Sequence, residues 1–312
     1  MPILYAVIVL LLAVNVILGL PRAVDLVQTK STAVNIPNNQ VVQGAVLDVA
    51  GAQKINLPKN LGISPPQLSA TSALVLDLDS DFLFFVKDPD KRVPIASTTK
   101  IMTALVAVDT FQPNQILTVP GVSLVSGSTM GLKVDEKLTF RSLLYGMLLN
   151  SGNDAAYTIA ANFPGGVSAF VEAMNNRAAI LGLSNTRFEN PAGFDSPNHF
   201  SSAADLSKIA AVAAGNPLLA RAVSTREVTV SSIDQGIIHP LKNLNKLLGL
   251  PGILGMKTGT TPAARENLVG LAERDGHKIL TVILGSDNRF GETEKLLDWV
   301  SSNFDWQQVP VR

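Results

Sequence analysis

A serine and a lysine three positions apart, Ser97 and Lys100, have the residue types and the spacing of a nucleophile and its base. On a helix, residues at this spacing lie on one face within contact distance. A serine hydroxyl becomes a good nucleophile only when a neighbouring base accepts its proton. A buried lysine can do so because burial lowers the pKa of its amine. The pair therefore predicts nucleophilic catalysis by Ser97, with Lys100 as the base.

The segment that follows predicts a buried helix with this pair on its first turn. Apolar residues recur at i, i+3, i+4 and i+7 from Ile101, and other apolar residues cover most of the remaining circumference. Pro94, shortly before the pair, is typical of a helix entrance. Because the first turn of a helix leaves backbone N–H groups unpaired, we expect free donors beside Ser97.

The apolar runs elsewhere predict strands at both ends of the domain and helices in its middle. Expected strands lie at 73–78, 82–86, 227–231, 255–259, 268–273 and 279–284. Expected helices lie at 143–148, 155–163, 167–181, 203–214 and 293–304, and 185–202 reads as an irregular polar loop. This order predicts an α+β fold, an antiparallel sheet flanked by helices with an all-helical lobe inserted.

Composition excludes several functional classes. With 25 Lys+Arg against 25 Asp+Glu, the 312-residue chain lacks the basic excess of nucleic-acid-binding proteins. It has no cysteine, which excludes disulfides, thiol catalysis and cysteine-ligated metals. None of its three histidines has a metal-ligand spacing, so no metal site is predicted. We expect Asp154 to cap a helix and His199 to lie on the surface of the polar loop.

The N-terminal residues 2–20 are apolar and uncharged, long enough to span the ~30 Å hydrocarbon core of a membrane. A cleaved signal peptide and a retained anchor are both open. No basic residue precedes the run and Leu18–Pro21 is a poor cleavage site, which favours the anchor. We therefore predict an anchor at 1–21, an extracytoplasmic linker at 22–71 and a catalytic domain at 72–312.

Two further short motifs follow the serine–lysine pair. Lys257-Thr258-Gly259 occurs once, on a predicted strand. The pattern S-x-N occurs at four places, 151, 196, 286 and 301. The last two follow K-T-G in the chain and are excluded, because we expect S-x-N between the other two motifs. The one at 196 lies in the irregular loop. We therefore select Ser151-Gly152-Asn153, at the junction of two predicted helices.

With S-x-x-K, S-x-N and K-T-G in this order, the chain resembles the penicillin-recognising serine enzymes. More narrowly, it resembles the low-molecular-weight D-alanyl-D-alanine carboxypeptidases of peptidase family S11. The closer match is carried by residues 94–104, 148–156, 190–195 and 255–261, and the resemblance covers about 72–305. It implies the β-lactamase/transpeptidase-like fold.

The resemblance implies that Ser97 attacks the carbonyl between two D-alanines to form an acyl-enzyme, and that Lys100 accepts its proton. Ser151 would relay a proton to the leaving amine. Asn153 would hold Lys100 and the substrate amide. The nearby cation Lys257 would help to lower the pKa of Lys100.

In the third motif, the resemblance implies that Lys257 and Thr258 receive the terminal carboxylate of the substrate. Gly259 would permit close backbone approach, and the N–H groups of Ser97 and Thr260 would form the oxyanion hole. Neighbouring side chains of a strand point to opposite faces, so a twist or bulge must bring both Lys257 and Thr258 to the site. Many family members have a histidine where this chain has Thr260.

The implied function is removal of the terminal D-alanine from peptidoglycan stem peptides, in a bacterial cell envelope, with β-lactams as covalent inhibitors and without metal or cofactor. A D,D-endopeptidase, a β-lactamase and a catalytically silent wall-binding protein are the alternatives. The best-known β-lactamases need a deacylating Glu in E-x-x-L-N, and the stretch from Glu172 lacks the Leu. The Ser97–Lys100 pair argues against a silent protein.

Overall fold

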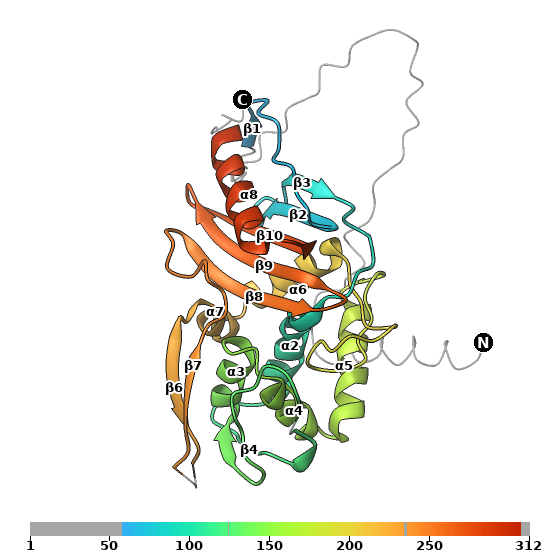
Figure 1. Cartoon of the computed structure of the whole chain (residues 1–312), viewed down its shortest axis with the longest axis vertical. Helices are drawn as coiled ribbons and strands as arrows, with labels where there is room; N and C mark the ends of the chain where they lie inside the picture. The colour runs from blue at the N-terminus through green and yellow to red at the C-terminus, as the bar shows by residue number, and fades with distance from the viewer. Residues whose placement is uncertain (1–57, 124, 234–235, 307–312) are drawn as a thin grey trace, which may run out of the picture. The chain divides into compact units, whose positions relative to one another are not determined.

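A five-stranded antiparallel sheet lies at the centre of the computed structural model, which describes residues 58–123, 125–233 and 236–306 (Figure 1). The strand order is β3–β2–β10–β9–β8. The strands are β2 (Ser72–Asp77), β3 (Leu83–Lys87), β8 (Ile253–Thr261), β9 (Arg265–Arg274) and β10 (His277–Ser286). Because β2 pairs with β10, the two ends of the domain meet in one sheet, as the apolar runs predicted.

The two faces of this sheet bury two separate sets of side chains. On one face, residues such as Val75 and Ile283 pack with Leu296 and Val300 of α8 (Arg289–Asn303). On the other face, alternate residues such as Val282 join the main core, which includes α2 and α6. This alternation is the period of two expected of strands covered on both sides.

The helices between β3 and β8 form the predicted helical lobe. They are η1 (Ala96–Thr99), α2 (Lys100–Thr110), η2 (Gly121–Ser123), α3 (Phe140–Leu148), α4 (Asn153–Ala161), α5 (Gly166–Ile180), α6 (Ala203–Ala214) and α7 (Pro217–Ser224). The predicted central helix is confirmed: α2 is buried from Lys100 to Ala107. Ser97 lies in the 3₁₀ turn η1 that precedes it, rather than on α2 itself.

Two small hairpins and one helix differ from the sequence-based expectation. The strand expected at 227–231 is present as β6 (Glu227–Ser231), but it pairs with β7 (Ile238–Lys242) outside the main sheet. A second pair joins β4 (Ile116–Thr118) to β5 (Lys137–Thr139). The unpredicted α7 has a clear start signal, since Asn216 caps its first N–H groups and Pro217 follows.

The packed unit begins upstream of the expected boundary at residue 72. β1 (Pro58–Asn60) pairs antiparallel with β11 (Phe304–Trp306). The linker predicted over 22–71 is therefore wrong for 58–71. These residues pack against segments near the C-terminal end of the domain, and no local sequence pattern indicates such distant partners. The predicted anchor at 1–21 lies outside the described residues. Among the residues that are described, no helix is both long and apolar enough to cross a membrane.

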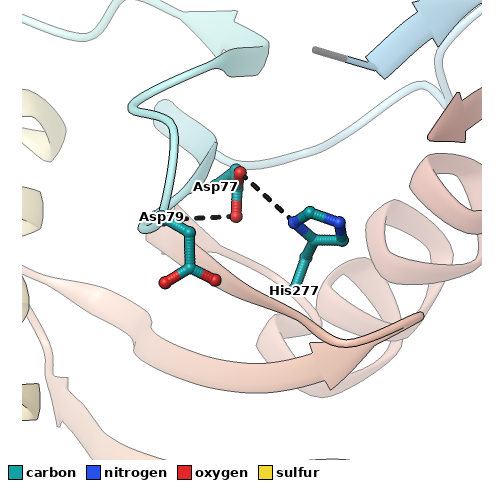
Figure 2. Close-up of side chains that lie close together, drawn as sticks. All are labelled: Asp77, Asp79 and His277. Atoms are coloured by element: carbon teal, nitrogen blue, oxygen red, sulfur yellow. Dashed lines mark hydrogen bonds and ion pairs between the residues drawn. The ribbon is translucent and has the colours of Figure 1, made fainter. Parts of the chain in front are cut away.

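Asp77, Asp79 and His277 converge at one end of the sheet and offer three potential metal ligands (Figure 2). The Asp77 carboxylate already accepts hydrogen bonds from the backbone N–H groups of Asp79, at 3.4 Å, and Ser80, at 3.2 Å. The ring of His277 stacks on Trp306, with centroids 3.5 Å apart. These contacts close the β2–β3 turn and tie it to β10, so the cluster has a structural role.

Candidate active site

Ser97 and Lys100, the expected nucleophile and base, lie in direct contact. Lys100 Nζ is 2.8 Å from Ser97 Oγ, and the lysine is 0% exposed. The 3₁₀ turn and the first turn of α2 place both side chains on one side of the helix start, as the spacing predicted.

Two obligate acceptors complete the surroundings of the Lys100 amine. Nζ donates to Asn153 Oδ1 at 2.8 Å and to the carbonyl of Ala192 at 2.6 Å. The Asn153 amide donates to the carbonyl of Ser126 at 2.9 Å, which turns Oδ1 toward the lysine. A neutral amine has two N–H groups and one lone pair. In a neutral Lys100 with its N–H groups on these two acceptors, the lone pair would face the hydroxyl of Ser97.

The electrostatic environment favours this neutral amine. Burial holds the pKa of Lys100 well below its usual value, the nearby cation Lys257 lowers it further, and Asp154 opposes the shift. A base must be unprotonated to accept the proton of Ser97. Geometry and electrostatics thus both support the expected role of Lys100 as the base that accepts the proton of Ser97.

The turn that carries Ser97 packs closely between a loop and a strand. Ala96, just before Ser97, has a left-handed φ of 47°. A Cβ on Gly193 would lie 1.9 Å from the carbonyl oxygen of Ala96, and a Cβ on Gly259 would lie 3.0 Å from the nitrogen of Ser97. Both positions therefore require glycine for the backbone to approach this closely. Strained conformations of this kind persist where the surroundings determine them strongly.

The loop 190–195 builds the wall that carries the Ala192 carbonyl. The side-chain oxygen of Asn190 accepts from the N–H groups of Ala192, Gly193 and Phe194 at 3.2, 2.7 and 3.0 Å. The Asn190 side chain thereby stabilises the turn formed by residues 190–194. The sequence showed that this segment resembles the family, but it did not predict that the Ala192 carbonyl binds Lys100. Every residue has a backbone carbonyl, so no residue type indicates such a contact.

His199 is buried, at 2% exposed, and the expectation of a surface histidine is wrong. Its Nδ1 accepts from the N–H of Glu189 at 3.1 Å, so its Nε2 carries the proton and donates to Thr99 Oγ1 at 2.7 Å. Thr99 in turn donates to the carbonyl of Ala96 at 2.8 Å. Burial lowers the pKa of His199 to about 4, which keeps the ring neutral near pH 7. A chain of three hydrogen bonds thus supports the turn before Ser97.

The second motif lies at the junction of α3 and α4. Ser151 has a left-handed φ of 58° and is 3% exposed. Its hydroxyl makes no hydrogen bond to any residue that the structure describes, which leaves it available to a bound substrate. Asp154 accepts from the backbone N–H groups of Met130, Gly131 and Leu132, so it fastens the neighbouring loop to α4. The N-cap of α4 is Gly152 rather than Asp154.

The third motif lies on β8, at the edge of the sheet. The register with β9 shifts between Ile253 and Gly255, and Met256 has a φ of 96°, so the expected irregularity is present. Lys257 and Thr258 are 1% and 4% exposed, and Lys257 Nζ donates to the carbonyl of Thr258 at 3.0 Å. Burial, and then the charge of Arg289, lower the pKa of Lys257 to about 7.

Comparison with known families decides the class of the chain. A family model described as the D-alanyl-D-alanine carboxypeptidases of family S11 matches residues 59–288. This chain belongs to the S11 peptidase family. The S11 match confirms the resemblance that the three motifs predicted, and it makes the chain a serine-type D-alanyl-D-alanine peptidase. Its start at residue 59 agrees with the packing of β1.

The relatives that match this chain are named for two different activities, endopeptidase and carboxypeptidase. The chain is 33% identical over 265 residues to a D-alanyl-D-alanine endopeptidase of Pseudomonas aeruginosa, covering 82% of this chain and 85% of the relative. It is also 33% identical over 263 residues to a D-alanyl-D-alanine carboxypeptidase of Escherichia coli, covering 78% of this chain and 66% of that relative. Sequence similarity alone therefore does not separate the two activities.

The fold agrees with that of two solved structures. The Streptomyces K15 DD-transpeptidase matches with a TM-score of 0.72 and 31% identity, covering 76% of this chain and 98% of that one. A D-alanyl-D-alanine carboxypeptidase of Mycobacterium tuberculosis matches with a TM-score of 0.73 and 33% identity, covering 78% and 96%. The predicted α+β, β-lactamase/transpeptidase-like fold is confirmed.

Proposed function

We propose that this enzyme is a D,D-carboxypeptidase that removes the terminal D-alanine from peptidoglycan stem peptides through an acyl-enzyme on Ser97. The observation that carries the proposal is the buried Lys100 amine, 2.8 Å from Ser97 Oγ, with two obligate acceptors on its N–H groups. A merely structural lysine has no need of a serine at this distance, or of the pKa shift that burial imposes.

In the acylation step, Ser97 Oγ attacks the carbonyl carbon of the penultimate D-alanine while its proton passes to Lys100. The backbone N–H groups of Ser97 and Thr260 stabilise the developing oxyanion. One donor of this kind contributes about 3–4 kcal/mol to the transition state. Gly259 supports this arrangement, since its missing Cβ lets β8 approach the nitrogen of Ser97.

The C–N bond then breaks, and the proton held on Lys100 reaches the leaving amine through the Ser151 hydroxyl. Asn153 holds Lys100 in place and binds the peptide amide, while Lys257 and Thr258 receive the carboxylate of the leaving D-alanine. A water molecule subsequently attacks the ester on Ser97 and releases the shortened peptide. Each of these groups comes from the enzyme itself, so the reaction calls for neither metal nor cofactor.

Two of the alternatives receive less support from the site. A β-lactamase of the best-known class needs a carboxylate that activates water at the ester, but Glu172, the candidate, is exposed on α5. A silent wall-binding protein would not preserve a buried lysine beside a serine. The D,D-endopeptidase stays as the second candidate, because an endopeptidase of Pseudomonas aeruginosa is among the relatives.

Release of free D-alanine tests the proposal. The enzyme is incubated with an N-acylated peptide ending in D-Ala-D-Ala, and separately with a cross-linked peptide dimer and with a penicillin. Rapid D-alanine release, with Ser97→Ala inactive, supports a carboxypeptidase. Preferential cleavage of the dimer makes the enzyme an endopeptidase, rapid turnover of the penicillin makes it a β-lactamase, and no reaction with any of the three refutes the assignment.

We further propose that the apolar segment 2–20 tethers the catalytic domain to the outer face of the cytoplasmic membrane, where β-lactams and stem peptides are both accessible. Its length and lack of charge support a spanning helix. The test is membrane fractionation of the full chain beside a variant lacking residues 1–21. Recovery of the full chain in the soluble fraction, at full length, would contradict the tether.

A further inference from the structure

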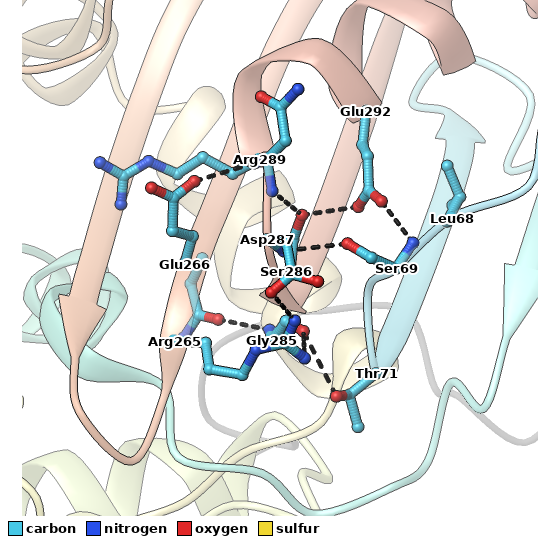
Figure 3. A network of polar contacts seen from close by, with 12 residues as sticks. Leu68, Ser69, Thr71, Arg265, Glu266, Gly285, Ser286, Asp287, Arg289 and Glu292 are labelled. Carbon is cyan, nitrogen blue, oxygen red and sulfur yellow. Dashed lines mark hydrogen bonds and ion pairs between the residues drawn. The ribbon is translucent and has the colours of Figure 1, made fainter.

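Two glutamates are buried among the residues that the structure describes, Glu136 and Glu292, and their partners differ. Glu292 of α8 accepts from neutral donors, the Ser286 hydroxyl at 2.6 Å and the backbone N–H of Ser69, in a network that joins α8 to the sheet (Figure 3). Glu136, in the loop before β5, is 0% exposed and has its Oε1 2.6 Å from Nε2 of His239 on β7. The Glu136–His239 pair lies outside the three motifs, and no step of the proposed reaction uses it.

Both ring nitrogens of His239 face oxygen atoms. Nδ1 is 3.0 Å from the backbone carbonyl oxygen of Met130, and Nε2 is 2.6 Å from the carboxylate of Glu136. A carbonyl and an ionised carboxylate only accept, so a ring that bonds to both carries two protons and forms an ion pair with the glutamate. The other oxygen of Glu136 accepts from the backbone N–H of Lys133 at 2.9 Å. The pair therefore holds the loop before β5 at two points, Met130 and Lys133.

The loop held by this pair surrounds the start of α4. The carbonyl of Ser126 accepts from the side-chain amide of Asn153 at 2.9 Å, and the carbonyl of Ser128 accepts from its backbone N–H at 2.7 Å. The backbone N–H of Met130 donates to the Asp154 carboxylate at 3.0 Å. Met130 thus has its N–H bound by α4 and its carbonyl bound by the buried pair, so it connects that pair to the S-x-N motif.

The side chain of Met130 fixes the loop against a second helix. Met130 is 7% exposed, and a Cβ on Gly146 of α3 would lie 2.1 Å from its sulfur. The glycine therefore leaves the space that the methionine fills. The carbonyl of Gly146 also accepts from the N–H of Gly152 at 3.0 Å, at the junction of α3 and α4. The loop is consequently packed against the junction that carries Ser151 and Asn153.

We propose that Glu136 and His239 are positioning residues for the acylation of the enzyme. By holding the loop, they keep the Ser126 carbonyl on Nδ2 of Asn153, at 2.9 Å, and so keep Oδ1 on the Lys100 amine, at 2.8 Å. An amide has a donor end and an acceptor end, so the contact with Ser126 decides which end faces the lysine. The inference rests on the proposed function, in which Lys100 is the base, and adds the β6–β7 hairpin to the elements that control acylation.

The competing explanation is that the pair only stabilises the fold. Removal of a purely structural pair lowers the free energy of unfolding but leaves the kinetic constants of the folded enzyme unchanged. Removal of a positioning pair also lowers the rate constant of acylation, because a catalytic group misplaced by about 1 Å can cost about 10²-fold in rate. Since the two members act together, the second substitution adds little to the first.

A second carboxylate–histidine pair in the chain provides a matched control. His277 Nδ1 lies 3.6 Å from Asp77 Oδ2, at the start of β10 (Figure 2). Thr258 of the K-T-G motif is aligned across β9 with Ile283, near the other end of β10. His277→Gln therefore removes a histidine–carboxylate contact at the opposite end of the sheet from the K-T-G motif.

Acylation of the full chain by a fluorescent penicillin is followed by stopped flow, which gives the dissociation constant of the first complex and the limiting rate constant separately. The variants are His239→Gln, Glu136→Gln, the double variant with both substitutions, and His277→Gln. We expect each of the first two to lower the limiting rate constant by about tenfold or more, with the dissociation constant within about twofold. The double variant, which leaves no buried charge unpaired, should lose no more than either single variant. His277→Gln should change neither constant.

Thermal unfolding shows which variants are folded, and the double variant decides where a single one is not. Unchanged rate constants in the folded double variant, or an equal loss in His277→Gln, would overturn the inference and leave the proposed function intact. A double variant that fails to fold would make the pair a requirement of the fold, which also overturns the inference. An unaltered enzyme that the penicillin does not acylate would overturn the proposed function, and the inference with it.

Discussion

The amine of Lys100 lies 2.8 Å from the hydroxyl of Ser97, with a backbone carbonyl and a side-chain amide oxygen occupying its two remaining positions. This contact combines two features that serine acylation needs: an amine within reach of the hydroxyl, and an environment that lowers the pKa of that amine. The S11 family supplies the reaction class, and this geometry supports the proposal that Ser97 is the nucleophile.

Replacing Lys100 by arginine keeps the positive charge and removes the base. A guanidinium cannot be deprotonated in a protein, so Lys100→Arg should slow acylation of Ser97 by a penicillin by about 10³-fold. The rate is measured with a fluorescent penicillin, beside Lys208→Arg on the exposed side of α6. If Lys100→Arg acylates as fast as Lys208→Arg, Lys100 is not the base.

The close approach of Gly193 to the Ala96 carbonyl can be tested by comparison with another glycine of similar conformation. Gly193 and Gly182 both have positive φ, of 93° and 65°, but only a Cβ on Gly193 meets neighbouring atoms, whereas Gly182 has none within 4 Å. Both alanine variants should share a backbone cost of about 1–2 kcal/mol. Gly193→Ala should lose about 1–3 kcal/mol more and slow acylation, because it displaces the Ala96 carbonyl.

Chemical denaturation and acylation rates of the two variants check this prediction. Equal unfolding free energies and equal acylation rates for Gly193→Ala and Gly182→Ala would show that the loop does not hold the nucleophile turn.

The buried His199 predicts a loss of stability in mild acid. Its pKa in the folded state is about 4, below the ordinary value of 6.5. Between these two pH values the ring is therefore protonated in the unfolded chain but neutral in the folded chain. The stability contributed by the neutral ring is full above about pH 6.5 and is lost as the pH falls toward 4. The loss is about 3 kcal/mol.

This pH dependence is measured by urea denaturation at several pH values. His199→Gln, which cannot titrate, should be less stable than the unaltered enzyme at pH 7 and should lack the His199 component of the acid loss. A variant that retains the whole acid loss would assign it to other groups.

The lowered pKa of Lys257 predicts a loss of binding on the alkaline side. Above about pH 7 its amine becomes neutral and attracts the substrate carboxylate less strongly, so KM for the peptide acid should rise there. Since the charge of Arg289 helps to lower this pKa, Arg289→Gln should move the rise to higher pH. Kinetics from pH 5 to 9 test both statements, and an unshifted profile in Arg289→Gln would contradict the second.

Much of the fold and the site was predictable, because apolar runs and short sequence motifs indicate them directly. Apolar runs located the five sheet strands and the central helix, and the order of three short motifs brought together Ser97, Lys100, Ser151, Asn153 and Lys257. The Ala192 carbonyl and His199 were not predictable, since the first has no residue-type signal and the second is buried by a loop without periodicity. β1 was missed because its partner, β11, lies at the opposite end of the domain.

The most direct test of the account is the site of covalent attachment of a penicillin. The intact enzyme is reacted with benzylpenicillin, digested with a protease and analysed by mass spectrometry, beside Ser97→Ala. We predict one penicilloyl group per chain, on Ser97, and none on Ser97→Ala. An adduct on any other residue, or an equal adduct on Ser97→Ala, would contradict the assignment of Ser97 as the nucleophile.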